Sequence, residues 1–366
     1  MTIPFLDLGA AYRELKADID VAVHRVLDSG WYILGPEVEA FEAEWATWCG
    51  ADHAVGLANG LDALILALRA LDVGPGDEVI VPSNTYIATW LAVSAVGATP
   101  VPVEPDPLTH NLDPHALAEA LSPATKVILP VHLYGQPADL DPILALARTR
   151  GIFVVEDAAQ AHGARYKGQR IGAHGDVVCW SFYPGKNLGA LGDGGAITTN
   201  RADLADKIRV LRNYGSRVKY INEVQGVNSR LDPLQAAILR AKLPHLQAWT
   251  ERRQVLAQIY TEGLAQTSLI RPFVPAWADP AWHLYVVCTT EREALQKHLS
   301  AAGIGTLIHY PVPPHAQDAY GPLGLDPSAL PVASRLAQQV LSLPMGPHLE
   351  PSAAQAVVRA IMDWVA

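Results

Sequence analysis

The stretch from Phe153 to Asn200 constrains this chain more than any other, because it places an acid pair and a lysine in a tight loop among three short apolar runs. The first run ends on Glu156 and Asp157, and Lys186 follows in a loop of small residues. Pyridoxal phosphate (PLP) needs a lysine for its Schiff base and a carboxylate to keep its ring nitrogen protonated. Taken alone, the pairing also suits a capping aspartate and a solvated lysine. It becomes specific only through the residues around it.

The segment 54–199 alternates short apolar runs with segments of helical periodicity. Such alternation predicts an α/β fold with a mainly parallel sheet that helices cover on both faces. Ligands of these sheets bind at the carboxyl ends of the strands, and Asn59, Ser83 and Asp157 all follow such runs. We therefore expect these three residues to meet at one edge of the sheet.

A strand, a glycine turn and a helix start follow one another at 54–62. The first turn of a helix presents free backbone N–H groups that bind phosphate, so we predict that the amides of Gly60, Leu61 and Asp62 cradle the phosphate of PLP. Three more side chains are predicted to face the same crevice, with ordinary packing or solvent exposure as the alternative: Tyr86 at the start of the next helix, Gln160 one helical turn beyond Asp157, and Ser181 ahead of Lys186.

Three long motifs, EDAAQAHGA from Glu156, SFYPGKNLGALGDGG from Ser181 and GVNSRLDPLQAAIL from Gly226, resemble the DegT/DnrJ/EryC1/StrS family of PLP-dependent nucleotide-sugar aminotransferases. The resemblance runs from Pro4 to the segment around Leu343. It implies an aspartate-aminotransferase-like fold (fold type I), with a seven-stranded, mainly parallel sheet and a smaller C-terminal α+β domain. Some relatives replace the lysine with histidine and remove a hydroxyl instead, so the presence of Lys186 favours an aminotransferase.

The resemblance also implies partners and residue roles. L-Glutamate is the usual amino donor and leaves as 2-oxoglutarate, Tyr86 stacks on the PLP ring, and the active unit is a homodimer with shared active sites. In such a dimer Asn228 reaches the phosphate of the other subunit's site. Lys219 and Arg230 are expected to pair with the substrate diphosphate. The full set of predicted substrate-binding residues comes from loops around the crevice: Tyr32, Tyr183, Lys219, Tyr220, Arg230, His309 and Tyr310.

The substrate that the resemblance favours is a dTDP-linked 3-keto-6-deoxyhexose, aminated at C3 to give a dTDP-3-amino-sugar. Segments 59–63, 83–89 and 309–315 look more like the 3-ketosugar branch, and many relatives have threonine where this chain has Leu61. Two alternatives stay open: a C4 aminotransferase acting on a 4-keto sugar linked to dTDP, UDP or GDP, and a PLP-binding regulatory protein without turnover. A nucleotide-cofactor oxidoreductase is disfavoured, because the glycines between 189 and 195 do not form G-x-G-x-x-G.

The length of 366 residues, half of them hydrophobic, predicts two domains within one compact subunit. Helices on either side of Pro244 place the boundary there, which gives a large PLP-binding domain at 1–244 and a small C-terminal domain at 245–366. Among the expected elements are single helices at 12–27 and 114–121, a helix cap at Ser83 or Asn84, and a strand at 306–309.

The charge balance, 27 basic against 37 acidic residues for a net charge of −10, contains no basic run, so nucleic acid is not expected as a partner. No apolar run approaches the ~20 residues that span a bilayer. The N-terminus does not resemble a signal peptide, and the three scattered cysteines are typical of reduced thiols. We therefore expect a cytoplasmic protein. No metal is predicted, because His309, Tyr310 and His315 lack the spacing of a dedicated site.

Overall fold

The computed structural model describes residues 2–365 and is built around one seven-stranded sheet. Its strands are short and mostly buried: β1 (His53–Leu57), β2 (Glu78–Pro82), β3 (Thr99–Val103), β4 (Thr125–Ile128), β5 (Phe153–Asp157), β8 (Val177–Ser181) and β9 (Gly195–Thr199). Their order is β1-β9-β8-β5-β4-β2-β3. All strands except β9 run in the same direction, because β9 pairs antiparallel with both β1 and β8. The predicted mainly parallel, seven-stranded sheet is confirmed.

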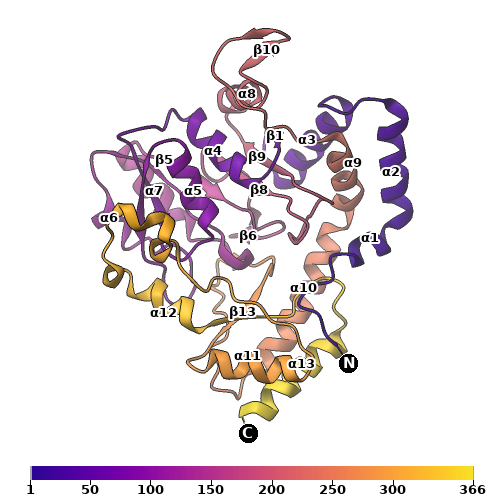
Figure 1. Cartoon of the computed structure of the whole chain (residues 1–366), viewed down its shortest axis with the longest axis vertical. Helices are drawn as coiled ribbons and strands as arrows, with labels where there is room; N and C mark the ends of the chain where they lie inside the picture. The colour runs from indigo at the N-terminus through magenta and orange to yellow at the C-terminus, as the bar shows by residue number, and fades with distance from the viewer. Residues whose placement is uncertain (1, 366) are drawn as a thin grey trace.

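Helices cover both faces of this sheet (Figure 1). Successive strand side chains point to opposite faces, so Val155 packs in one hydrophobic cluster and Val154 in another. The first face is covered by α4 (Gly60–Ala70), α5 (Ile87–Ala95) and α8 (Ala202–Leu211). The second face is covered by α3 (Pro36–Cys49), α6 (Leu117–Ala120), α7 (Leu140–Arg150) and α9 (Pro233–Lys242).

The C-terminal part of the chain forms a smaller unit around its own core, seen at the bottom of Figure 1. Its elements are η2 (Leu243–His245), α10 (Leu246–Gly263), β13 (Tyr285–Cys288), α11 (Arg292–Ala301), η3 (Pro314–Ala316), η4 (Asp318–Leu323), η5 (Pro327–Ala329), α12 (Pro331–Gln339), β14 (Val340–Leu343) and α13 (Pro351–Val365). The core also contains Ile3, which bridges Ile304 from the opposite end of the chain. The predicted boundary at Pro244 falls inside η2 and stays a prediction.

Two short sheets and the N-terminal helices complete the fold. A three-stranded sheet joins β6 (Arg165–Tyr166) to β7 (Gln169–Arg170) and to β12 (Ala278–Asp279) of the C-terminal unit. The connection after α8 forms a hairpin, β10 (Ser216–Val218) and β11 (Ile221–Asn222), that projects from the top of the molecule in Figure 1. At the side of the molecule, α1 (Ala10–Glu14) leads into α2 (Lys16–Ser29), which packs against α9.

Several expected elements were wrong in detail. The helix predicted at 12–27 is broken at Leu15, whose backbone is not helical. The cap predicted at Ser83 or Asn84 is wrong, because α5 begins only at Ile87 with Tyr86 at its N-cap. The Ser83 and Asn84 side chains instead donate hydrogen bonds to Glu104 and to a backbone carbonyl.

Two further expectations fail in extent. The predicted helix at 114–121 is limited to the four residues of α6. The predicted strand at 306–309 is reduced to a single bridge between Leu307 and Ser342. The 306–309 segment pairs with β14 at this one point only, so no strand extends through it. Among residues 2–365, none of the helices has the length and apolar character needed to cross a membrane.

Candidate active site

A cavity of about 810 Å³ opens at the carboxyl ends of the parallel strands, between the sheet and the C-terminal unit. Asn59 and Asp157 line it as expected from the strand ends. Ser83 does not, because its hydroxyl is turned to Glu104. Ten of the residues singled out from the sequence line the cavity together: Gly60, Leu61, Tyr86, Asp157, Gln160, Ser181, Tyr183, Lys186, His309 and Tyr310.

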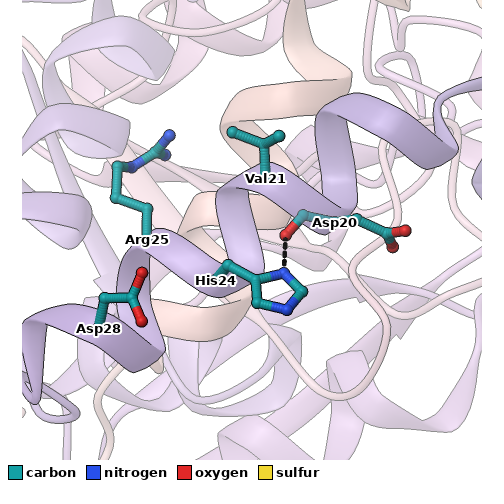
Figure 2. A pocket seen from close by; sticks show the side chains of 5 residues that line it. All are labelled: Asp20, Val21, His24, Arg25 and Asp28. Atoms are coloured by element: carbon teal, nitrogen blue, oxygen red, sulfur yellow. Dashed lines mark hydrogen bonds between the residues drawn. The ribbon is translucent and has the colours of Figure 1, made fainter.

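A second hollow lies on the outer surface of α2, and Figure 2 shows its five residues: Asp20, Val21, His24, Arg25 and Asp28. All five belong to one helix, and the His24 ring is bonded to the backbone carbonyl of Asp20. Arg25 turns to the carboxylate of Glu37 on α3. This hollow is an open helix surface without convergent groups, so the strand-end cavity is the candidate site.

The loop that carries Lys186 is held tightly at its base. Ala190 donates a backbone hydrogen bond to Phe182 O at 2.8 Å, and the ammonium of Lys242 donates to Gly189 O at 2.6 Å. A Cβ at position 189 would come within 2.4 Å of Pro184 O, so the loop closes only with glycine there. Because both ends of the loop are fixed, Lys186 has a defined position in the cavity wall.

Burial lowers the pKa of Lys186 to about 8, although the nearby carboxylate of Asp157 favours the charged form. Three imidazoles around Lys186 are kept neutral. Burial, with the charge of Lys186 as the next cause, lowers the pKa of His162 to about 3, that of His309 to about 4, and that of His283 well below its usual range. Within residues 2–365 the amine of Lys186 makes no hydrogen bond, so it is available for chemistry in the cavity.

Asp157 is fixed through both its backbone and its side chain. Its N–H donates to Pro130 O at 2.9 Å, and its carbonyl accepts from the N–H of His132 at 3.0 Å. Its carboxylate accepts hydrogen bonds from the Thr89 hydroxyl at 2.9 Å and the Ala159 amide at 3.1 Å. Burial raises the pKa of Asp157, while these two donors and the amine of Lys186 favour the ionised form.

The neighbouring acid, Glu156, serves a different purpose. It is fully buried and accepts hydrogen bonds from His132 Nε2 at 2.9 Å and from the Gly175 amide at 2.5 Å. The Nδ1 atom of His132 accepts from the Ala138 amide, so Nε2 carries the proton and the imidazole is neutral. Burial raises the pKa of Glu156, but the His132 contact and the other donors outweigh it and lower the pKa overall. Glu156 is absent from the cavity lining.

The first turn of α4 meets the end of β8 without room for a side chain. A Cβ on Gly60 would lie 2.6 Å from the Ser181 Cβ. The Asn59 side chain caps the helix by accepting from the Asp62 amide at 2.8 Å. The Asp62 amide already has a partner here, so its part in the phosphate cradle stays a prediction. The Gly60 and Leu61 amides remain, together with the Ser181 hydroxyl.

Gln160 is buried and well ordered by its contacts, but it does not lie on a helix as predicted, because a turn follows β5. Its Oε1 accepts from the Tyr134 amide at 2.6 Å, and its Nε2 donates to the Tyr310 hydroxyl at 3.0 Å. The Tyr310 ring lies 5.2 Å from the ring of Tyr86. Tyr86 leaves 54% of its surface exposed at the cavity, as a ring that covers a planar ligand requires.

The remaining predicted residues lie outside this chain's own cavity. They are Tyr32, Lys219, Tyr220, Asn228 and Arg230. Lys219 and Tyr220 form the turn of the projecting hairpin, where Tyr220 is 87% exposed. Arg230 donates to Asn213 at 2.9 Å, and Tyr32 donates to Leu27 O at 3.2 Å. Within a single chain, Lys219 and Arg230 do not take the diphosphate-binding place expected of them.

Sequence reasoning missed several residues of the site. Thr89 bonds Asp157, and its spacing of three residues from Tyr86 on one helix is a signal that could have revealed it. His283 lines the cavity and contacts Asn187 at 3.2 Å, but no local pattern links these distant segments. Phe5, Leu6 and Leu8 form one apolar wall, although their segment carried only a family resemblance.

The site fits PLP by the groups that it offers. A partly buried lysine, a buried carboxylate, an exposed aromatic ring, and two helix-terminal amides beside a serine hydroxyl all converge on one cavity. These groups match the aldehyde, ring nitrogen, ring face and phosphate of the cofactor. Within residues 2–365, no group of three or more His, Cys, Asp or Glu side chains is arranged to hold a metal ion.

The comparisons with known proteins agree with this geometry. The DegT/DnrJ/EryC1/StrS aminotransferase family model matches residues 13–362. The dTDP-3-amino-3,4,6-trideoxy-alpha-D-glucose transaminase of Streptomyces venezuelae is 57% identical over 99% of this chain and 96% of its own length. The erythromycin biosynthesis sensory transduction protein EryC1 of Saccharopolyspora erythraea is 58% identical over 99% of each chain.

A solved structure, that of S. venezuelae DesV in complex with a ketimine intermediate, superposes with a TM-score of 0.98. It is 57% identical and covers 100% of this chain and 98% of its own. The likeness confirms the aminotransferase fold that the sequence predicted, and with it PLP as the cofactor. The chain is a PLP-dependent sugar aminotransferase that belongs to the DegT/DnrJ/EryC1/StrS family.

Proposed function

We propose that this enzyme transfers the amino group of L-glutamate to C3 of a dTDP-linked 3-keto-6-deoxyhexose. The observation that supports this choice of substrate is the similarity, at 57% identity over nearly the full length, to a relative named as a dTDP-3-amino-3,4,6-trideoxy-alpha-D-glucose transaminase. The cavity supports it. Leu61, Leu91 and Leu307 line its wall with apolar groups, which suit a sugar that lacks hydroxyls at some carbons.

The chain's residues divide the binding of PLP among themselves. The Gly60 and Leu61 amides and the Ser181 hydroxyl hold the phosphate, Tyr86 covers the ring, and Asp157 pairs with the ring nitrogen. When bound, PLP supplies the electron-accepting ring that amino transfer needs. Lys186 anchors the cofactor. Its amine Nζ takes the proton from the α-carbon of L-glutamate and, in the second half-reaction, delivers a proton to C3 of the sugar.

The depressed pKa of Lys186 suits this work. At a pKa of about 8 roughly a tenth of the amine is neutral at pH 7, far more than at the ordinary value of 10.5, and only a neutral amine accepts a proton. The low pKa values of His283 and His309 make their rings weak bases, which leaves Lys186 as the main base beside the cofactor. Tyr183, His309 and Tyr310 face the cavity and offer hydroxyl and imidazole groups to sugar oxygens.

We also propose that the active unit is a homodimer in which each site borrows residues from the partner. The supporting observation is an apolar surface in one region of the chain. Tyr214, Val218, Tyr220, Ile221 and Val224 are all 49% exposed or more on and beside the hairpin. Large exposed apolar groups of this density are typical of interfaces. Asn228 and Lys219 lie on this same connection, which suits binding in the partner's cavity.

Product analysis tests the function. With L-glutamate as amino donor, the enzyme should aminate a dTDP-linked 3-keto-6-deoxyhexose. NMR of the product should show the new amine at C3. Amination at C4, or turnover only with UDP- or GDP-linked sugars, would overturn the substrate while leaving the aminotransferase in place. The name of the EryC1 relative raises regulation without turnover as a second candidate. A failure of glutamate to convert the bound cofactor to its amine form would favour that candidate.

A further inference from the structure

A pair of threonine hydroxyls lies behind the cofactor-binding acid. Thr89 Oγ1 donates to Asp157 Oδ2 at 2.9 Å, and Thr85 Oγ1 lies 3.0 Å from Thr89 Oγ1. Thr89 is completely buried, and Thr85 is 2% exposed at the cavity wall. Water is thus excluded from the Thr89 contact, so nothing but protein groups solvates this side of the carboxylate.

The direction of the two hydrogen bonds follows from the chemistry of a hydroxyl. Each threonine has one hydrogen to donate. The hydrogen of Thr89 is used on the carboxylate of Asp157, which when ionised only accepts. The bond between the two threonines must then run from Thr85 to Thr89. Both dipoles therefore point toward the acid, and a chain of hydrogen bonds strengthens its members.

The same helix turn serves two purposes. Tyr86 at the N-cap of α5 exposes its ring to the cavity, and Thr89 lies three residues on, in the first turn. Residues at this spacing share one helix face. The position of Thr89 against Asp157 therefore fixes Tyr86 relative to the acid. The Ala159 amide holds the other carboxylate oxygen, which leaves the carboxylate no freedom to rotate.

We propose that Thr89, polarised by Thr85, is a positioning residue that keeps Asp157 ionised and aimed at the ring nitrogen of PLP. The need for such a group is physical, because a buried carboxylate without donors takes up a proton. A protonated Asp157 cannot hold a protonated ring nitrogen, and the ring then accepts electrons poorly. The inference rests on the assignment of Asp157 as the ring acid.

The test combines two substitutions with two cofactors. Thr89→Val keeps the shape and removes the hydroxyl, whereas Thr89→Ser keeps the hydroxyl. Each full-length variant is stripped of cofactor and titrated with PLP or with the analogue in which a carbon replaces the ring nitrogen. The readout is the ratio of the two dissociation constants, measured by fluorescence. This ratio reports only the interaction of the ring nitrogen with its acid.

The wild-type enzyme should prefer PLP, and Thr89→Val should reduce this preference by about ten-fold or more, the range of a hydrogen bond to a charged group. Thr89→Ser should keep it, and Thr85→Val should reduce it by less than Thr89→Val. With PLP bound, kcat of Thr89→Val should fall while the KM for the sugar changes little. If valine disturbs folding, Thr89→Ala supplies the same comparison with a smaller side chain.

Two outcomes contradict the proposal in different ways. If the wild-type enzyme binds both cofactors equally well, Asp157 does not pair with the ring nitrogen, and the proposal for Thr89 fails with that assignment. A wild type that prefers PLP, with Thr89→Val showing the same preference or losing affinity for both cofactors equally, would leave Asp157 in place and show that Thr89 is merely structural.

Discussion

The inner wall of the cavity and the projecting hairpin contain residues of the same predicted site but differ in how they are held. On the inner wall, Asp157 and Gln160 are each fixed by two or more hydrogen bonds inside one chain. On the hairpin, the ammonium of Lys219 lies over the ring of its neighbour Tyr220, 5.0 Å from the ring centroid. The groups of the inner wall are thus fixed within a single chain, whereas the role proposed for the hairpin depends on a partner chain. Under this proposal, groups fixed within one chain bind the cofactor, and groups supplied by a second chain help to bind the substrate.

The largest expected effect concerns the two buried lysines beside the cavity. Lys186 and Lys242 both have a pKa lowered to about 8 by burial, but only Lys186 lines the cavity. Lys186→Ala should abolish amino transfer and the borohydride-trapped cofactor adduct, because among residues 2–365 Lys186 is the one lysine that lines this chain's cavity. Peptide mapping of the wild type provides the matched control. Cofactor found on Lys242 would contradict the assignment.

Asp157→Asn should lower kcat by orders of magnitude with the fold retained, because the ring nitrogen loses its charged partner. The neighbouring Glu156→Gln is the matched control. It should cost about 1–3 kcal/mol of unfolding free energy, because the glutamine amide has only one oxygen for the two buried donors, His132 Nε2 and the Gly175 amide, with a much smaller effect on kcat. Steady-state kinetics and denaturant titration separate the two. Equal losses of kcat in both variants would contradict the assignment of the catalytic role to Asp157 alone.

Mixing experiments test whether the hairpin region serves the partner's site. Lys186→Ala and Asn228→Asp chains should each be inactive, and together they should recover about a quarter of the wild-type rate. In an equal mixture, half of all dimers are heterodimers, and each heterodimer has one intact site out of two. The measurement is activity after subunit exchange, with exchange followed independently by mass spectrometry. Proven exchange without recovery would argue that each chain's site is self-sufficient.

The contrast between the two regions also explains what the sequence could predict. The sheet and the site at its edge follow from local patterns, since Asp157 ends an apolar run and Gly60 begins a helix. Thr89 was visible only as a spacing from Tyr86. His283 and the wall formed by Phe5 could not be predicted, because they meet the cavity through contacts between distant parts of the chain. The capping of the Asp62 amide by Asn59 could not be predicted either, because it depends on a side-chain rotamer.

Lys219→Ala should affect substrate capture alone. If Lys219 binds the diphosphate in the partner's site, its removal should raise the KM for the nucleotide sugar by about ten-fold, since hydrogen bonds to charged groups are worth roughly 1.5–3 kcal/mol. The half-reaction with glutamate should be unchanged. Arg217 on the same hairpin pairs with Asp206 and Glu223 of its own chain, so Arg217→Ala is a suitable control. A raised KM for glutamate would contradict this division.

The last effect concerns the stability of the cofactor-free protein and not its activity. The pKa of Lys186 falls from 10.5 to about 8 in the folded chain. Between these values the unfolded chain binds a proton that the folded chain does not, so stability rises with pH in this window. At pH 7 the buried charge therefore costs about 3 kcal/mol, since one pKa unit is worth about 1.4 kcal/mol, and Lys186→Met should be more stable than the wild type by about that much. Above pH 10.5 the difference should vanish, while Lys242 titrates equally in both proteins. Denaturant unfolding at pH 7 and above 10.5 measures this, with Lys219→Met as the surface control, expected within about 0.5 kcal/mol of the wild type. A difference that persists at high pH would mean that the methionine only improves packing. The charge of Lys186 on the inner wall would then destabilise the folded chain no more than the charge of Lys219 on the hairpin does.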